Sequence, residues 1–214
     1  MMEVEQIWRY VDSERASLAE FLSGLSAAEW TTPSLCSGWT VQAVAAHVIS
    51  SPQARAWPVV AGLIRYRGDF NRLILEEGHR AAATHSPEQI IAQYHQYAGS
   101  RRHPLGTTPA DPLLDVLIHG QDITIPLGYR REMPPEAARA AADRIWTKSF
   151  PFKARKRLAG VRLVATDIPW TAGQGPEIRG PISAVLLLLS NRPTPAHPHL
   201  SGPGLPTLHP TTYS

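Results

Sequence analysis

The sequence predicts a mainly α-helical protein, with a helical bundle over residues 1–150, a small α/β region over 151–192 and a proline-rich tail over 193–214. Apolar residues recur at helical spacing through the first 150 residues, and several of these segments open on helix-start signals. The first stretch with strand-like alternation comes only afterwards, at 161–166. These observations favour a bundle followed by a smaller mixed extension.

The first segment repeats apolar side chains on one helical face and should form a long helix that ends near Gly24; these side chains are Ile7, Val11, Leu18, Leu22 and Leu25. Ser26 opens a Ser-x-x-Glu capping box, which predicts a short turn before a loop. Thr40 is placed to cap a second helix over residues 40–49. Pro52 should end or kink that helix because proline cannot donate its backbone hydrogen bond.

A helical stretch is expected over residues 57–63, and the region from there to Gly78 has no clear pattern. Further on, proline follows a capping residue or another proline three times, which is typical of the first position of a helix. The three resulting helices should run over 86–99, 111–125 and 134–145.

The pattern changes after residue 156. Residues 161–166 alternate and are rich in β-branched side chains, which predicts a strand, and 170–175 resembles a turn between strands. A short buried helix should follow Gly180 and stop at Asn191. The six prolines after residue 192 predict a surface tail over 193–214 rather than a packed element.

Composition limits the function classes. The net charge of +3 reflects 21 basic and 18 acidic residues, so no dense basic surface indicates nucleic acid binding. The longest apolar run, 184–189, is too short to span a membrane, and the N-terminus lacks the pattern of a signal peptide. A single cysteine excludes an internal disulfide and fits a reducing compartment. We therefore expect a cytoplasmic protein; whether it is a monomer or a homodimer cannot be predicted.

The strongest functional signal is Asp115 four residues before His119 inside a very apolar helical segment. Residues at this spacing lie one above the other on a helix, so both can contact one ion. His47, beside the apolar stripe of the second helix, is the best third ligand. A buried carboxylate needs a compensating positive charge. A divalent cation would supply it, and so would an ion pair with His119 or with a lysine or arginine; the residues leave these alternatives open.

Three His and Asp ligands with one vacant position would suit zinc or nickel and indicate a catalytic rather than a structural site. Asp122 lies three residues after His119 and could orient that ligand as a hydrogen-bond acceptor. Its alternative role is ordinary solvation on the helix surface.

Several motifs together resemble the mycothiol-dependent maleylpyruvate isomerase family of DinB-like four-helix metalloproteins. The resemblance extends over about residues 4–192 and includes the small C-terminal α/β extension. It is carried by Glu14-Arg15, Glu29-Trp30, Pro33-Ser34-Leu35-Cys36-Ser37-Gly38-Trp39-Thr40, Ala45-Ala46-His47, His119-Gly120-Gln121-Asp122 and Pro126-Leu127-Gly128.

This resemblance implies a DinB-like bundle whose metal ligands are His47, Asp115 and His119. It also implies mycothiol as the thiol cofactor or cosubstrate, and a cis–trans isomerase or thiol S-transferase acting on a small electrophile. The chain departs from the better-known isomerases by carrying aspartate where they have glutamate. The alternative is therefore a metal-binding or small-ligand-binding protein that has kept the bundle without turnover.

Two further residues are weaker candidates. Arg179 could bind an anionic substrate, although an exposed pair with Glu177 is the more ordinary interpretation. Cys36 could be imagined as a nucleophile, but with no histidine nearby in sequence it is expected to be a small packed side chain.

Overall fold

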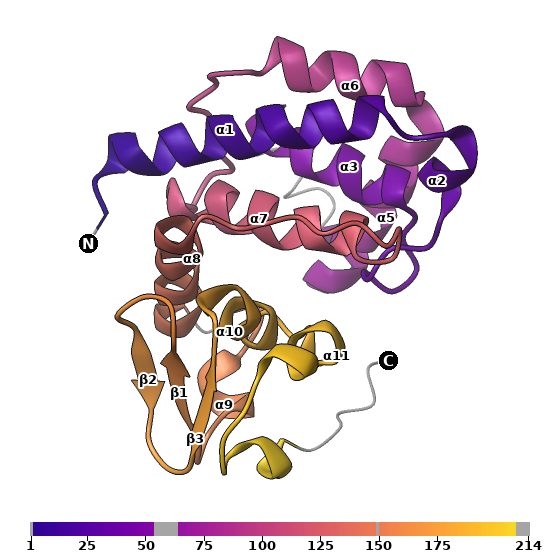
Figure 1. Cartoon of the computed structure of the whole chain (residues 1–214). Coiled ribbons are helices and arrows are strands. Elements are labelled where there is room, and N and C mark those ends of the chain that lie inside the picture. Colours follow the sequence, from indigo (N-terminus) through magenta and orange to yellow (C-terminus); the bar gives the residue numbers. More distant parts are fainter. Residues whose placement is uncertain (1, 54–63, 149, 209–214) are drawn as a thin grey trace. The chain divides into compact units, whose positions relative to one another are not determined.

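The computed structural model describes residues 2–53, 64–148 and 150–208 (Figure 1). The chain divides into an N-terminal unit, Met2–Arg131, and a C-terminal unit, Glu132–Ser214. This division groups α8 (Pro135–Thr147) with the C-terminal elements, whereas the sequence pattern grouped it with the bundle. The helix expected over 57–63 lies outside the described residues.

Four helices of the N-terminal unit close into a ring. α1 (Val4–Ser23) and α3 (Val41–Ser50) each pack against both α6 (Pro87–Gln96) and α7 (Ala110–Thr124). This arrangement is a four-helix bundle, so the predicted fold class is confirmed. Among the described residues, no helix combines the length and apolar character needed to cross a membrane.

Three of the predicted helix starts, those of α2 (Ala27–Thr31), α3 and α6, are formed by side-chain caps. Ser26 forms a capping box at the start of α2, and Ser86 forms another before α6. The Thr40 side chain accepts a hydrogen bond from the backbone of Ala43 at 3.3 Å. Such caps satisfy amide groups that a helix leaves without partners, which is why these sequence signals located the helices well.

α7 begins at Ala110, slightly before the expected start at Asp111. The Asp111 carboxylate accepts hydrogen bonds from the backbone and hydroxyl of Thr108, which lies outside the helix. The apolar residues of α7 are almost all buried, as predicted. Most of the surface of α7 is therefore buried.

The chain around the region without a clear sequence pattern contains a proline turn and a helix that was not predicted. α3 ends at Ser50, and the 3₁₀ turn η1 (Ser51–Gln53) contains Pro52, as the proline predicted. α5 (Phe70–Thr84) was not predicted; it packs against α3. Gly78 also lets α5 lie close to Trp39, which precedes α3, because a Cβ atom at this position would overlap the Trp39 ring.

A buried ion pair joins α1 to the segment after α7. Arg131 Nη2 donates to Glu14 Oε2 at 2.7 Å, and Arg131 Nη1 donates to Ser17 Oγ at 3.0 Å. A Cβ atom on Gly120 would lie 3.0 Å from Arg131 Nε. Glu14 binds the Arg131 side chain and Gly120 leaves room for it. These two motif residues therefore keep the chain after α7 packed against α1.

The C-terminal unit contains a three-stranded sheet in the order β2-β1-β3, with β1 antiparallel to β2 and parallel to β3. α10 packs against the sheet and against α8. The expected turn over 170–175 is wrong in part, because residues 171–173 form β2. The bounds are α9 (Ala154–Arg157), β1 (Arg162–Ala165), β2 (Thr171–Gly173), β3 (Glu177–Gly180) and α10 (Ile182–Leu189).

The beginning of the proline-rich segment differs from the expected surface tail. It forms α11 (Pro193–Ala196) and the 3₁₀ turns η2 (His197–His199) and η3 (Leu205–Thr207). Arg179 and Ser201 exchange two backbone hydrogen bonds of 2.8 Å, which attach the segment to β3. Ala196 and Leu200 are buried. Apolar residues between the prolines therefore give this segment a packed face.

Candidate metal centre

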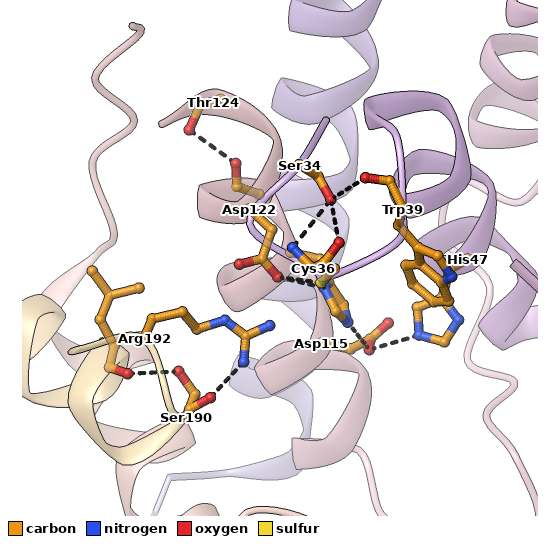
Figure 2. A network of polar contacts seen from close by, with 12 residues as sticks. Ser34, Cys36, Trp39, His47, Asp115, Asp122, Thr124, Ser190 and Arg192 are labelled. Atoms are coloured by element: carbon orange, nitrogen blue, oxygen red, sulfur yellow. Dashed lines mark hydrogen bonds and ion pairs between the residues drawn. The ribbon is translucent and has the colours of Figure 1, made fainter. Parts of the chain in front are cut away.

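The three side chains predicted as metal ligands converge in the N-terminal unit. Asp115 Oδ1 lies 3.5 Å from His47 Nε2 and 3.4 Å from His119 Nε2. One donor atom from each residue lies within 4.8 Å of the other two. Figure 2 shows the His47 and Asp115 side chains pointing toward one another. α3 and α7 thus bring residues separated by about seventy positions to one point.

The spacing of these donor atoms fits a small divalent cation. Zinc–nitrogen and zinc–oxygen bonds of about 2.0–2.1 Å in a tetrahedron place neighbouring donors about 3.3 Å apart. The two measured separations are close to that value. The side chains of His47, Asp115 and His119 are 20%, 25% and 15% exposed, so the cluster is partly accessible to solvent. The donor set therefore suits three protein ligands and one exchangeable position.

Trp39 packs beside both imidazoles. Its ring centroid lies 5.0 Å from that of His47 and 6.3 Å from that of His119. Trp39 is itself fixed because its Nε1 donates to the backbone oxygen of Leu75 in α5 at 3.2 Å. The ring therefore restricts the orientation of the two histidines. α5, which the sequence did not predict, supports the cluster in this way.

Asp122 lies where it can orient His119, as the sequence suggested. Its Oδ2 is 2.8 Å from His119 Nδ1, and Asp122 is completely buried. A proton on Nδ1 leaves Nε2 as the electron-pair donor that faces His47 and Asp115. The alternative of a solvated surface carboxylate is wrong.

Cys36 is closer to the cluster than its sequence neighbours suggested. Its Sγ donates to Asp122 Oδ2 at 3.0 Å and lies 3.6 Å from His119 Nδ1. Figure 2 shows Cys36 beside Asp122. Cys36, His119 and Asp122 form a second group of possible ligands. The separations of 2.8 and 3.0 Å are those of hydrogen bonds, which favours a network that supports His119.

The cluster favours opposite charges on its acid and one of its histidines. Burial alone would raise the pKa of Asp115, but the two neighbouring imidazoles outweigh it and hold this pKa below its ordinary value. Burial alone would lower the pKa of His119, but Cys36, Asp115 and Asp122 outweigh it and raise this pKa well above the ordinary value. The site is therefore arranged to receive positive charge.

Two arginines bear on the sequence predictions. Arg179 lies in β3 of the C-terminal unit, where its Nη1 is 2.6 Å from Glu177 Oε2. Its role in substrate binding remains a prediction. Arg15, part of the Glu14-Arg15 motif, is buried in α1; burial lowers its pKa, and the charge of Asp115 opposes this lowering. Its distance from Asp115 in sequence concealed this relation.

Known structures share this fold. One, described as a mycothiol-dependent maleylpyruvate isomerase, is 16% identical, and the match covers 94% of this chain and 93% of that one, with a TM-score of 0.63. A histidine-to-alanine mutant of a protein described in the same way is 15% identical, with the same coverage and TM-score. A comparison with curated proteins found no match.

The family is shown by the sequence itself. The profile described as mycothiol maleylpyruvate isomerase N-terminal domain matches residues 11–119, which is just over half of the 214 residues. The matched range contains all three residues of the donor cluster. The chain therefore belongs to the mycothiol maleylpyruvate isomerase N-terminal domain family.

Proposed function

We propose that this protein is a divalent-metal-dependent enzyme that uses mycothiol as cofactor or cosubstrate and acts on a small electrophile. The observation that carries the proposal is the convergence of His47, Asp115 and His119 within a domain of this family. The structural relative described as a mycothiol-dependent isomerase supports the choice of thiol and of reaction class. Zinc is the preferred ion and nickel the second choice, because imidazole suits both.

The cluster's own residues provide the binding and the orientation. His47 Nε2, Asp115 Oδ1 and His119 Nε2 would hold the ion, and Asp122 keeps the proton of His119 on Nδ1. When bound, the ion lowers the pKa of a coordinated thiol, so that the thiol is held as a nucleophilic thiolate. Trp39 limits the movement of both imidazoles.

Two outcomes are compatible with such a thiolate. In an isomerase of the maleylpyruvate type, sulfur adds to a conjugated double bond, the resulting single bond rotates, and elimination returns the trans product and the thiol. In an S-transferase, the thiolate would add to the same kind of double bond, whose π-bond would break while the neighbouring carbon takes up a proton, and the thioether adduct would be released. The donor cluster serves both reactions, so the electrophile decides between them.

The test measures metal content and thiol-dependent turnover together. The wild-type protein should contain about one divalent ion per chain and should isomerise maleylpyruvate or consume mycothiol in the presence of an electrophile. His47→Ala and His119→Ala should each remove both metal and activity. His95→Ala, in an exposed part of α6, is the control and should remove neither. Full activity in a metal-free H47A or H119A protein would refute the proposal.

A second candidate function is a metal- or ligand-binding protein without turnover. It is favoured by Asp115, whose side chain is one methylene shorter than the glutamate of the better-known isomerases. Stoichiometric metal without mycothiol-dependent turnover of any electrophile would select this candidate. Asp115→Glu then tests the cause: if the shorter acid abolished catalysis, the longer one should restore turnover without changing the metal content.

A further inference from the structure

The loop of residues 33–40, which joins α2 to α3, is attached to α7 beside the donor cluster. Leu35 N donates to the backbone oxygen of Asp122 at 3.1 Å. The next residue of the loop, Cys36, is half-buried, and its Sγ lies 3.6 Å from Nδ1 of the ligand His119. Cys36 thus lies at the metal centre without belonging to the three-ligand cluster.

Ser34 fixes the shape of this loop around Cys36. The Ser34 hydroxyl accepts a hydrogen bond from Cys36 N at 3.1 Å and donates to the backbone oxygen of Trp39 at 2.9 Å (Figure 2). Trp39 N in turn donates to the backbone oxygen of Cys36 at 3.0 Å. Because the backbone of Cys36 is bonded through both its N–H and its oxygen, the thiol projects from a fixed position.

The thiol lies at a different edge of the His119 ring from the donor cluster. The cluster meets Nε2 of His119, with Asp115 Oδ1 at 3.4 Å, whereas Cys36 Sγ lies near Nδ1. The two nitrogens of an imidazole are distinct, and the hydrogen bond at one of them determines what the other can bind. Cys36 is therefore placed to act on the ligand rather than on the ion.

The Asp122 carboxylate connects the thiol to the ligand. Its Oδ2 accepts a hydrogen bond from Cys36 Sγ at 3.0 Å and one from His119 Nδ1 at 2.8 Å. The last torsion of an aspartate side chain is broad, so the bond to His119 alone would define the plane of the carboxylate poorly. A second donor on the same oxygen narrows its range of orientations. Asp122 is completely buried, so solvent water does not reach it to replace a donor that is lost.

We propose that Cys36 is a positioning residue of the metal centre, whose thiol holds the Asp122 carboxylate in the orientation that receives the Nδ1 proton of His119. Cys36 acts through the hydrogen bond that it donates, and the volume of its side chain is secondary. This inference rests on the proposed function, because its consequence is tighter binding of an ion to the cluster. The ordinary alternative is a small side chain that only fills space.

Cys36→Ala and Cys36→Ser distinguish the two interpretations, because the variants differ by one hydroxyl donor. C36A should weaken zinc binding about three- to tenfold, the order expected of one hydrogen bond. C36S keeps a donor and should recover most of this loss. A residue that only fills space would give the reverse order, since a buried hydroxyl is more costly than a methyl group. Competition with a chromophoric chelator measures the affinities and requires neither mycothiol nor turnover.

A double-mutant cycle with Asp122→Asn shows whether Cys36 acts through Asp122. D122N has already lost the carboxylate that transmits the effect, so adding C36A to it should change the zinc affinity less than about twofold. Ser37→Ala, at an exposed position of the same loop, is the matched control and should bind zinc as the wild type does. If C36A does not fold, Cys36→Val and Cys36→Thr provide the same comparison, because both side chains are β-branched and only threonine has a donor.

The results that overturn the inference are distinct from those that overturn the metal site. A C36A protein that binds zinc as tightly as the wild type, or more tightly than C36S, would show that Cys36 only fills space. An equal loss of affinity when C36A is added to the wild type and to D122N would show that Cys36 does not act through Asp122. A wild-type protein that does not bind zinc would refute the metal centre itself, and the inference with it.

Discussion

At the scale of single residues, the donor cluster is supported by groups that do not belong to it. His119 bonds through Nδ1 to Asp122, and Cys36 donates to the same carboxylate oxygen. An imidazole held in this way presents Nε2 in a fixed direction, which lowers the entropy lost when an ion binds. The affinity for metal should therefore depend on residues that never touch the ion.

Asp122→Asn should weaken metal binding by about 10- to 100-fold, because the neutral amide no longer stabilises the Nδ1 proton of His119. Competition with a chromophoric chelator measures this change. Asp111→Asn, the same substitution at the start of α7 and outside the cluster, is the matched control and should leave the affinity unchanged. Equal affinities for the two variants would refute the orienting role of Asp122.

The raised pKa of His119 predicts the direction in which pH changes metal affinity. In the metal-free protein His119 stays protonated to a higher pH than an ordinary histidine, and a protonated imidazole cannot bind a cation. Apparent affinity should therefore rise by roughly tenfold per pH unit and continue to rise above pH 7. Dissociation constants measured from pH 6 to 8 test this, and a constant affinity across that range would contradict it.

The convergence of His47, Asp115 and His119 was predictable from sequence, and so was the place of Asp122 beside His119, but the place of Cys36 was not. Asp115 and His119 lie four apart on one helix, so local spacing alone placed them together. Cys36 meets His119 across 83 positions. Such approaches depend on how the helices pack, which no local pattern contains.

At the scale of elements, the helices found from sequence are those with a capping or proline start signal or with a clear apolar face. α6 opens on a capping box and α7 is apolar along almost its whole length. α5 was missed although the Asp69 side chain caps it, because charged residues and Gly78 interrupt its apolar pattern. α5 is positioned by its contacts with Trp39 and α3. Helix propensity, a property of the local sequence, does not contain such tertiary contacts.

Gly78→Ala tests the contact between α5 and the donor cluster. The added Cβ would overlap the Trp39 ring, so the ring or the helix must move. We expect a loss of about 1–3 kcal/mol in the free energy of unfolding, the usual range for overpacking, and weaker metal binding because Trp39 packs on His47. Urea unfolding and metal titration measure the two effects.

Gly24→Ala is the control for this substitution, because a Cβ there makes only an ordinary contact, 3.6 Å from the Phe21 backbone oxygen. Its stability and metal affinity should remain close to those of the wild type. A G78A protein as stable as G24A would show that α5 does not pack closely against Trp39.

At the scale of the whole molecule, a bound metal ion should change the stability of the two units to different extents. The donor cluster lies entirely within Met2–Arg131. An ion that binds only the folded N-terminal unit stabilises that unit by mass action. The C-terminal unit has its own core around α8, α10 and the sheet. Unfolding experiments should therefore separate a metal-dependent contribution from a metal-independent one.

Saturating zinc should raise the unfolding temperature of the N-terminal unit, while a chelator should lower it. At a free ion concentration about 100-fold above Kd, the stabilisation is about 2.7 kcal/mol. For a unit of 130 residues, Met2–Arg131, that corresponds to a shift of about 10 °C in Tm. Calorimetry of the full chain measures the shift, and His119→Ala should abolish it because the ion loses one of its three protein ligands. An equal shift in H119A would mean that zinc acts at some other place in the molecule, so the donor cluster could not be the metal centre.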